Sequence, residues 1–300
     1  MTPPFFILFM KNIASLILVF FLLMACSSEK NETHGPKARW ICLSKQYNEI
    51  LAALDLESNV VAVDLSSVNP KSIQAIPKVG YHRALAIEPI LSFKPTLVIH
   101  DNNIAPEGVK DQLKELGVPM VAFQSKGTSV STTYDLIREM GDYFQVKERA
   151  ASLVAKMKKE LLEAKQDVAL YHDIPRVLVL HFGRAKNHYL MVTEKSPAAE
   201  VVKLAGGKLC IPGDKAMKMV SSEIIASSNP EVVLITDFGY DRFKNNQGSV
   251  VELPGLETTS AYKNQRIYRI NEYELMYFGT TLGAQVKKVS SLIHQPAQRQ

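Results

Sequence analysis

A long stretch without glycine or proline divides this 300-residue chain into two parts and limits the folds available to it. Residues 147–171 contain neither helix breaker, and Pro175 follows shortly afterwards. The apolar residues of the stretch recur at the spacing of one helix face: Ala150, Leu153, Val154, Met157, Leu161, Ala164 and Val168. At about 1.5 Å per residue, such a helix is roughly 37 Å long. The pattern predicts one stiff helix over 147–171 that joins two lobes and disfavours a large hinge closure between them.

Apolar runs of strand length alternate with segments of helical periodicity on both sides of this helix. The first part has predicted strands at 39–43, 60–64, 96–100 and 120–123, and helices at 47–54, 86–93, 107–116 and 132–144. The second part has strands at 176–182, 189–192, 232–237 and 266–270, and helices at 198–204, 223–228 and 275–293. This order is typical of the α/β class. We expect two Rossmann-like lobes, an N-terminal lobe over 39–146 and a C-terminal lobe over 172–300.

A short pattern occurs once in each predicted lobe. Residues 88–101 begin with a glutamate, and a proline seven residues later leads into a strand that ends at an aspartate. Residues 223–237 show the same order with the same spacing from glutamate to proline. The pattern favours two lobes related by duplication. Chance recurrence is the alternative, because helix–proline–strand units are common in α/β proteins.

The first 26 residues differ in composition from the rest of the chain. Lys11 precedes an almost uninterrupted apolar run from Ile13 to Ala25, which is shorter than the roughly 20 residues of a membrane-spanning helix. The run ends in Leu-Met-Ala-Cys26, which resembles the lipobox cut by lipoprotein signal peptidase. We expect a signal peptide at 1–26, acylation of Cys26 and a polar tether at 27–38. The alternative is an uncleaved anchor with an incidental cysteine, and both place the chain on a membrane.

Composition and motifs exclude several classes of function. With 46% hydrophobic and 22% charged residues the chain is an ordinary globular protein, and its formal charge of +5 is not gathered into a basic stripe. Nucleic acid is therefore not an expected partner. There is no Gly-x-Ser-x-Gly, Walker, His-Glu-x-x-His or Cys-x-x-Cys motif, so an enzyme is not expected either. Cys42 and Cys210 fall in different lobes and are expected to be free thiols.

The most informative segment is the polar, aromatic loop Val-Gly-Tyr-His-Arg-Ala-Leu-Ala-Ile-Glu at residues 79–88. It resembles the Val-Gly-Tyr-x-Arg-x-Leu-x-x-Glu signature of the periplasmic haem-binding proteins of bacterial haem ABC importers. The resemblance continues at 90–99, 197–207 and 253–255. It implies a class III periplasmic binding protein of the cobalamin and siderophore type, with two lobes joined by a backbone helix. It also implies that haem is the transported ligand and that a membrane-bound ABC permease dimer is the partner.

In that family the loop tyrosine is the axial ligand of the haem iron, so the resemblance gives this role to Tyr81. Ferric iron is a hard Lewis acid for which a phenolate is a suitable anionic ligand. Because a free phenol has a pKa of about 10, a nearby cation is needed to favour the phenolate at neutral pH. Arg83 is the expected cation, or else it reaches a haem propionate. The alternative for Tyr81 is an ordinary half-buried loop aromatic.

Further haem contacts are expected from the C-terminal lobe. His181, at the end of a predicted strand, is the candidate for a second iron ligand, since some family members add a histidine from the opposite lobe; a structural role is the alternative. His82 falls on the family's variable position and is expected at the rim of the site. Arg242 is expected in a loop at the cleft, where it pairs with a propionate or is simply solvated. Further candidates are the cations Arg184 and Lys186 and the aromatic residues Phe182, Tyr189, Tyr240 and Phe243.

The repeated glutamates Glu88 and Glu223 each begin a predicted helix. Favourable placement of a carboxylate at a helix N-terminus is the minimal explanation. The resemblance implies a second one, in which each glutamate docks on arginines of one of the two permease subunits, which suits a two-fold partner. Pro89 departs from the family, which typically has a glycine there, although proline is tolerated in a first helical turn.

Two other readings use the same fold. A siderophore-binding or cobalamin-binding protein shares the two-lobed architecture but needs no phenolate ligand. An enzyme that degrades haem or exchanges its metal would use the same crevice for chemistry.

Overall fold

The computed structural model describes residues 38–183, 188–245 and 253–294. The expected signal peptide, Cys26 and nearly all of the tether lie outside these residues, as do Arg184 and Lys186. Cys42 and Cys210 are free thiols, as predicted. Among the described residues, no helix is both long enough and apolar enough to cross a bilayer.

The N-terminal lobe contains a four-stranded parallel sheet in the order β2-β1-β3-β4. Neighbouring residues of β1 enter different cores, Ile41 on one face and Cys42 on the other, because successive side chains of a strand point to opposite faces. Helices therefore cover both faces, as in other parallel sheets. The elements are β1 (Trp40–Cys42), α2 (Lys45–Ala53), η1 (Glu57–Asn59), β2 (Val60–Val63), η2 (Lys71–Ala75), α3 (Ile87–Ser92), β3 (Leu97–Ile99), α4 (Gly108–Glu115), β4 (Met120–Val121) and α5 (Val130–Tyr143).

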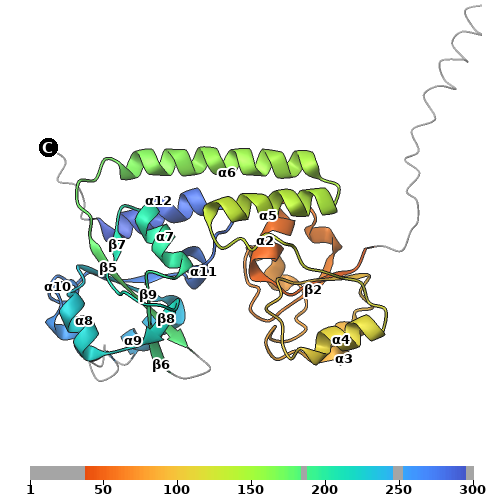
Figure 1. Ribbon diagram of the computed structural model, residues 1–300, viewed down its shortest axis with the longest axis horizontal. Coiled ribbons are helices and arrows are strands. Elements are labelled where there is room, and N and C mark those ends of the chain that lie inside the picture. Colours follow the sequence, from red (N-terminus) through yellow and green to blue (C-terminus); the bar gives the residue numbers. More distant parts are fainter. Residues whose placement is uncertain (1–37, 184–187, 246–252, 295–300) are drawn as a thin grey trace, which may run out of the picture. The chain divides into compact units, whose positions relative to one another are not determined.

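The C-terminal lobe contains a mixed sheet in the order β10-β9-β5-β6-β8, with β7 paired to β5 (Figure 1). Its central strands also alternate between two cores, with Val177 and Val179 on one side and Leu178 and Leu180 on the other. The elements are β5 (Arg176–Gly183), β6 (His188–Val192), α7 (Pro197–Leu204), β7 (Lys208–Leu209), β8 (Met217–Met219), α8 (Ser222–Ser228), β9 (Val232–Thr236), α9 (Asp237–Asn245), η3 (Leu256–Thr258), α10 (Ser260–Lys263), β10 (Ile267–Ile270), α11 (Glu272–Met276) and α12 (Leu282–Ile293).

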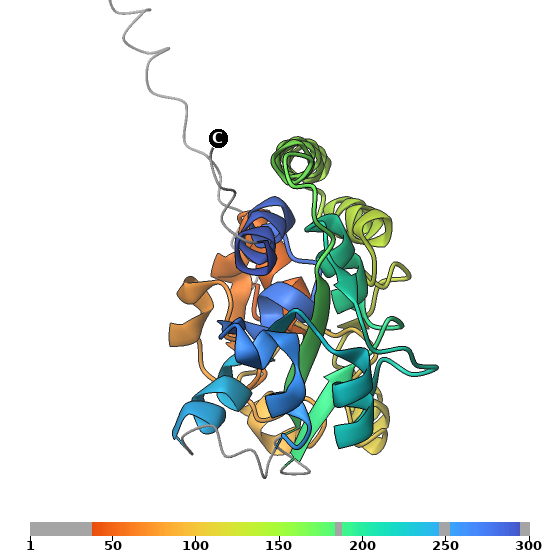
Figure 2. The same ribbon diagram turned by 90° about the vertical axis from the view of Figure 1, so that its left-hand side faces the viewer.

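The long helix α6 (Lys147–Val168) contributes to the cores of both lobes. Ala150, Val154 and Met157 from its first half are buried with the N-terminal lobe, whereas Leu161 and Ala164 from its second half are buried with the C-terminal lobe. The helix runs across both lobes in Figure 1 and is seen almost end-on at the top of Figure 2. The prediction of two α/β lobes joined by one helix is confirmed.

Two features of the C-terminal lobe differ from the sequence-based prediction. Strand β6 runs antiparallel to β5, so the lobe contains a hairpin where the apolar pattern alone does not distinguish the two directions. The helix predicted over 275–293 is two helices, because residues 277–281 make contacts with the other lobe instead of continuing the helix. Gly279 permits this approach, since a Cβ there would lie 2.5 Å from the Glu49 carboxylate.

A buried carboxylate on α2 connects the lobes. Glu49 accepts hydrogen bonds from the Tyr273 hydroxyl, from the Thr280 backbone N–H at 2.7 Å and from the Thr280 hydroxyl at 2.6 Å. Burial and the neighbouring Glu49 carboxylate raise the pKa of Tyr273, so its hydroxyl keeps the proton that it donates. Gln46, one turn earlier, donates to the Phe278 carbonyl at 2.8 Å and to the Gly127 carbonyl at 2.9 Å. We call this set of bonds the Glu49 contact.

The Glu49 contact makes a prediction about stability. Glu49→Ala leaves several buried donors without an acceptor, and each such loss costs about 1–3 kcal/mol. We expect the free energy of unfolding, measured by urea titration, to fall by roughly 3 kcal/mol. Glu115→Ala, which removes an exposed carboxylate from α4, is the control and should change it by less than about 0.5 kcal/mol. Equal effects of the two substitutions would contradict the proposed importance of the contact.

Candidate functional site

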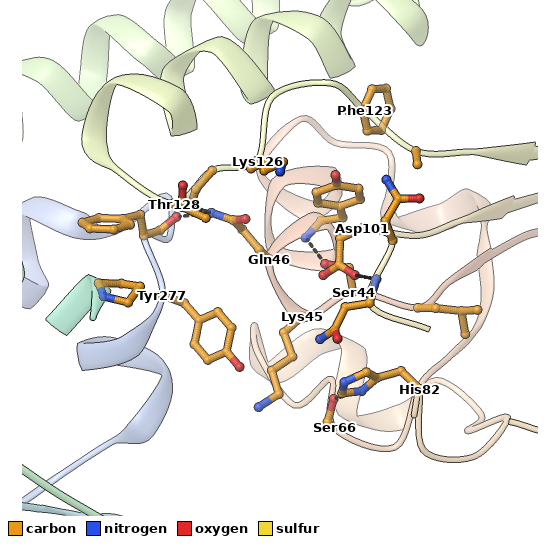
Figure 3. A pocket seen from close by; sticks show the side chains of 18 of the residues that line it. Ser44, Lys45, Gln46, Ser66, His82, Asp101, Phe123, Lys126, Thr128 and Tyr277 are labelled. Atoms are coloured by element: carbon orange, nitrogen blue, oxygen red, sulfur yellow. Dashed lines mark hydrogen bonds between the residues drawn. The ribbon is translucent and has the colours of Figure 1, made fainter. Parts of the chain in front are cut away.

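The carboxyl ends of the four N-terminal strands meet at one cavity of about 480 Å³. Ligands of open α/β sheets bind at this edge, next to the point where the strand order reverses. We call it the α2 cavity, because the first turn of α2 forms one wall (Figure 3). The residues that follow the strands and line it include Leu43 and Ser44 after β1, Ser66 after β2, Asp101, Asn102 and Asn103 after β3, and Ala122 and Phe123 after β4.

A second cavity, of about 560 Å³, is lined by both lobes and contains Tyr81 and His181. We call it the Tyr81 cavity. Several of its apolar side chains are unusually exposed for their type: Leu65 at 59%, Val68 at 48%, Tyr81 at 45% and Phe238 at 43%. Exposed apolar patches are found at ligand-binding grooves and at other interaction surfaces. The C-terminal lobe contributes the strand-end residues His181 and Phe182 of β5, Thr236 of β9 and Asn271 after β10.

The loop that presents Tyr81 is fixed by its backbone. Gly80 has a φ of +113°, a conformation that side-chain-bearing residues rarely adopt, and its carbonyl accepts the Leu65 N–H at 2.7 Å. The Ala105 N–H donates to the His82 carbonyl at 2.9 Å on the other side of Tyr81. The loop is thus bonded on both sides of the tyrosine, while the phenol side chain itself stays exposed in the cavity.

Below the loop, a buried carboxylate orients His82. Asp64 accepts hydrogen bonds from His82 Nδ1 at 3.0 Å, from the Ser66 N–H at 2.9 Å, and from the hydroxyls of Ser66 and Ser67. Burial acts to raise the pKa of Asp64, but the hydrogen bonds from His82 and the two serines outweigh it and lower the pKa, so the carboxylate stays ionised. The His82 ring lies against the Tyr81 ring, with centroids 4.6 Å apart, and lines the α2 cavity.

The C-terminal lobe places two of the predicted residues near the Tyr81 cavity. His181 Nδ1 lies 3.3 Å from the Thr236 hydroxyl, and its ring lines the cavity opposite the N-terminal lobe. Arg242 lies in α9, not in a loop as the sequence analysis expects. The glycine in Asp-Phe-Gly-Tyr resembles a turn signal, but Gly239 serves close helix packing, since a Cβ there would lie 3.1 Å from the Phe182 Cβ. The Arg242 guanidinium stands over the Phe182 ring at 5.0 Å, within cation–π range.

The candidate aromatic residues separate into two groups. Phe182 lines the Tyr81 cavity. Tyr189 is buried and donates its hydroxyl to the Gly239 carbonyl at 2.6 Å, and Tyr240 and Phe243 pack against the C-terminal core. Of these four candidates, Phe182 is therefore the one whose ring can contact a ligand in the Tyr81 cavity.

Three predicted residues lie outside both cavities. Arg83 is exposed and lines neither of them, although it is two residues from Tyr81. Glu88 and Glu223 are exposed in the first turns of α3 and α8, the equivalent positions that the repeated pattern predicts.

Lys45, which was not predicted from the sequence, is a cation that lines both cavities. Its ammonium lies 3.6 Å from a Glu272 carboxylate oxygen and 5.0 Å from the centroid of the Tyr277 ring. Burial acts to lower the pKa of Lys45, but Tyr277, Glu272 and Asp64 together raise it, so the ammonium stays charged. The available signal was the position of Lys45 directly after the helix-capping Ser44, at the end of a buried strand.

A family model described as "Periplasmic binding protein" matches residues 41–274. The chain belongs to this family. Its members bind solutes outside the cytoplasm and work with ABC transporters. The resemblance predicted from the sequence is therefore confirmed at the level of the family.

Solved structures and curated relatives of this binding protein differ in the ligand named. The periplasmic heme-binding protein RhuT from Roseiflexus sp. RS-1 has a TM-score of 0.78, is 26% identical, and covers 86% of this chain and 98% of its own. The periplasmic heme-binding protein BhuT, in complex with two hemes, has a TM-score of 0.76 at 25% identity, covering 85% and 97%. The vitamin B12-binding protein of Photorhabdus laumondii is 23% identical over 217 residues, 72% of this chain and 76% of the relative. These neighbours confirm the class III fold.

The buried carboxylate below the Tyr81 loop predicts a pH-dependent loss of stability. Because the pKa of Asp64 is lower in the folded chain than its ordinary value of 3.8, its stabilising effect is complete above that value and lost as the pH falls through the folded-state pKa. Asp64→Asn should lower the free energy of unfolding by about 2 kcal/mol at pH 7, and the difference from the parent should shrink below about pH 4.

The matched control is Asp111→Asn, which changes an exposed carboxylate of α4. Urea titrations of the three proteins between pH 7 and pH 3 test the prediction. A difference between parent and Asp64→Asn that stays constant over this range would contradict it.

Proposed function

We propose that this protein captures haem outside the bacterial cytoplasmic membrane and delivers it to an ABC importer, with Tyr81 as the axial ligand of the ferric iron. The observation that carries the proposal is the Tyr81 cavity, in which an exposed phenol on a fixed loop stands among exposed apolar side chains and His181 lines the same space from the other lobe. Haem requires these two properties together, a donor atom for its iron and apolar surfaces for its ring.

The walls of the cavity suit a flat macrocycle. Leu65 and Val68 come from the N-terminal lobe and Phe238 from the C-terminal lobe, so apolar surfaces are available on both sides of a ligand held between them. Covering these side chains removes apolar area from water, which contributes about 25 cal/mol per Å² to binding. Phe182, below the Arg242 guanidinium, adds an aromatic ring to the same wall.

The remaining predicted residues take supporting roles in the proposal. His181 is the candidate second ligand, and its contact with Thr236 orients its ring. Arg242 lies near enough to the cavity to pair with a propionate at its edge, through its position over Phe182. Arg83 is exposed beside the loop and does not line the cavity. It therefore contacts a propionate only where that group projects out of the cavity.

The proposed docking on the ABC permease involves one glutamate on each lobe. Glu88 and Glu223 are exposed at equivalent helix starts, one on each lobe, where two equivalent permease subunits can each bind one of them. Acylation of Cys26 would hold the protein at the membrane surface close to that permease.

A cobalamin-binding protein is the second candidate, because the curated relatives carry that name. It would use the same cleft, but an exposed tyrosine on a fixed loop has no required partner in a corrinoid. The two functions therefore differ in whether Tyr81 binds an iron atom, and not in the shape of the cleft.

The test is a titration of the purified apoprotein with haemin, followed by absorption spectroscopy. We expect the parent protein to give the spectrum of tyrosinate-ligated ferric haem, and Tyr81→Phe to lose that spectrum and weaken binding about tenfold or more, equal to about 1.4 kcal/mol. Tyr262→Phe, which changes an exposed tyrosine of the C-terminal lobe, is the control and should bind like the parent.

An apoprotein that ignores haemin but binds cyanocobalamin would overturn the proposal in favour of the second candidate. A spectrum that is unchanged in Tyr81→Phe would remove Tyr81 from the iron while leaving haem as the ligand.

Membrane attachment has its own test. We expect mass spectrometry of the protein from membranes to find an N-terminal acylated Cys26, and Cys26→Ser to leave an unprocessed precursor without acyl chains. An unmodified Cys26 inside an intact N-terminal segment would instead support the uncleaved anchor.

A further inference from the structure

We propose that the α2 cavity is a carboxylate-binding subsite, in which Lys45 pairs with acidic groups of a ligand whose ring occupies the Tyr81 cavity. The inference rests on the proposed function, because it concerns how the same ligand is oriented and selected. It assigns a propionate of haem to the α2 cavity and the iron to the Tyr81 cavity, which leaves the other propionate for Arg242.

The two cavities meet at Lys45. Lys45 and Ser66 line both of them, whereas Tyr81 lines only one and Lys126 only the other. In Figure 3 the Lys45 side chain extends from the start of α2 into the space between Tyr277 and Ser66. A ligand that spans the boundary between the cavities therefore passes this ammonium group.

Lys45 is charged and has partners on Glu272 and Tyr277, which occupy two of its three donors. Its side chain is only 21% exposed, and the recorded carboxylate partner, on Glu272, is 3.6 Å away, longer than a good hydrogen bond. The Tyr277 hydroxyl accepts a hydrogen bond from the ammonium, which also lies 5.0 Å from the centroid of the Tyr277 ring. An ammonium group has three donors, so Lys45 has capacity for a ligand carboxylate.

The other polar groups of the α2 cavity fit an acidic ligand edge. Lys126 adds a second positive charge, and the Ser44 and Thr128 side chains supply hydroxyl donors. The opposing charge in the wall is Asp101, whose carboxylate accepts the Asn103 N–H at 3.1 Å. Two lysines and one aspartate line the cavity, while Glu272, the carboxylate partner of Lys45, lines the Tyr81 cavity and the imidazole of His82 is held by Asp64.

The contrast between the cavities points to the class of ligand. Both cavities mix polar and apolar side chains, but Tyr81 and the exposed Leu65, Val68 and Phe238 line one of them, whereas Ser44, Lys126 and Thr128 line the other. A metalloporphyrin with carboxylates on one edge matches both. A cobalamin has neutral amides around its ring and a single phosphodiester in its nucleotide loop, so it has no carboxylate on its ring edge for a fixed ammonium.

The experiment compares haemin with haemin dimethyl ester, in which both propionates are esterified and the iron is unchanged. The proteins are the parent, Lys45→Gln, Lys45→Arg and the control Lys71→Gln, which removes an exposed charge outside both cavities. We expect Lys45→Gln to weaken haemin binding roughly tenfold, as loss of a charged hydrogen bond does. Binding of the ester should change less than about twofold, and Lys45→Arg should retain most of the preference for haemin over the ester.

The outcomes separate this inference from the proposed function. If Lys45→Gln weakens haemin and its ester equally, Lys45 acts through the structure of the cleft and the subsite is wrong. If the parent binds haemin with a Tyr81-dependent spectrum and Lys45→Gln has no effect, the subsite is also wrong while the proposed function stands. If the parent binds neither compound, the proposed function fails first.

Discussion

The arrangement of this molecule depends on one buried carboxylate. Glu49 projects from a helix of the N-terminal lobe and satisfies three donors of the C-terminal lobe, two of them on Thr280. A buried charge is tolerated only when its hydrogen bonds are complete, so the segment between α11 and α12 has little freedom to move away from α2. The edges of the two sheets are thereby held facing each other, and the two cavities are the space that remains between those edges.

Complete hydrogen bonding of buried polar groups also fixes the loop that carries Tyr81. Asp64 has no exposed side-chain surface and is satisfied by serines and by His82, which in turn lies against the tyrosine. Backbone bonds at Gly80 and His82 fix the main chain on either side. The phenol is thus presented by a rigid support, although its own side chain is nearly half exposed, and rigid support with an exposed donor is the usual arrangement of a preorganised binding site.

Much of this was accessible from the sequence, because it depends on local patterns. Alternating apolar residues predict the strands, the uninterrupted helical face over 147–171 predicts α6, and the motif around Tyr81 predicts the family. Three features were not accessible. Strand direction in the β5–β6 hairpin, the helical position of Arg242 and the place of Lys45 between two cavities all depend on contacts between distant segments. Arg83 was expected near the ligand because it is two residues from Tyr81, but it does not line the Tyr81 cavity.

Helix α6 also limits how the lobes can move. Because its two halves are embedded in different cores, bending it or pulling it free would expose buried apolar residues of one lobe or the other. Small movements of the cavity walls are therefore favoured over a large rotation of one lobe against the other.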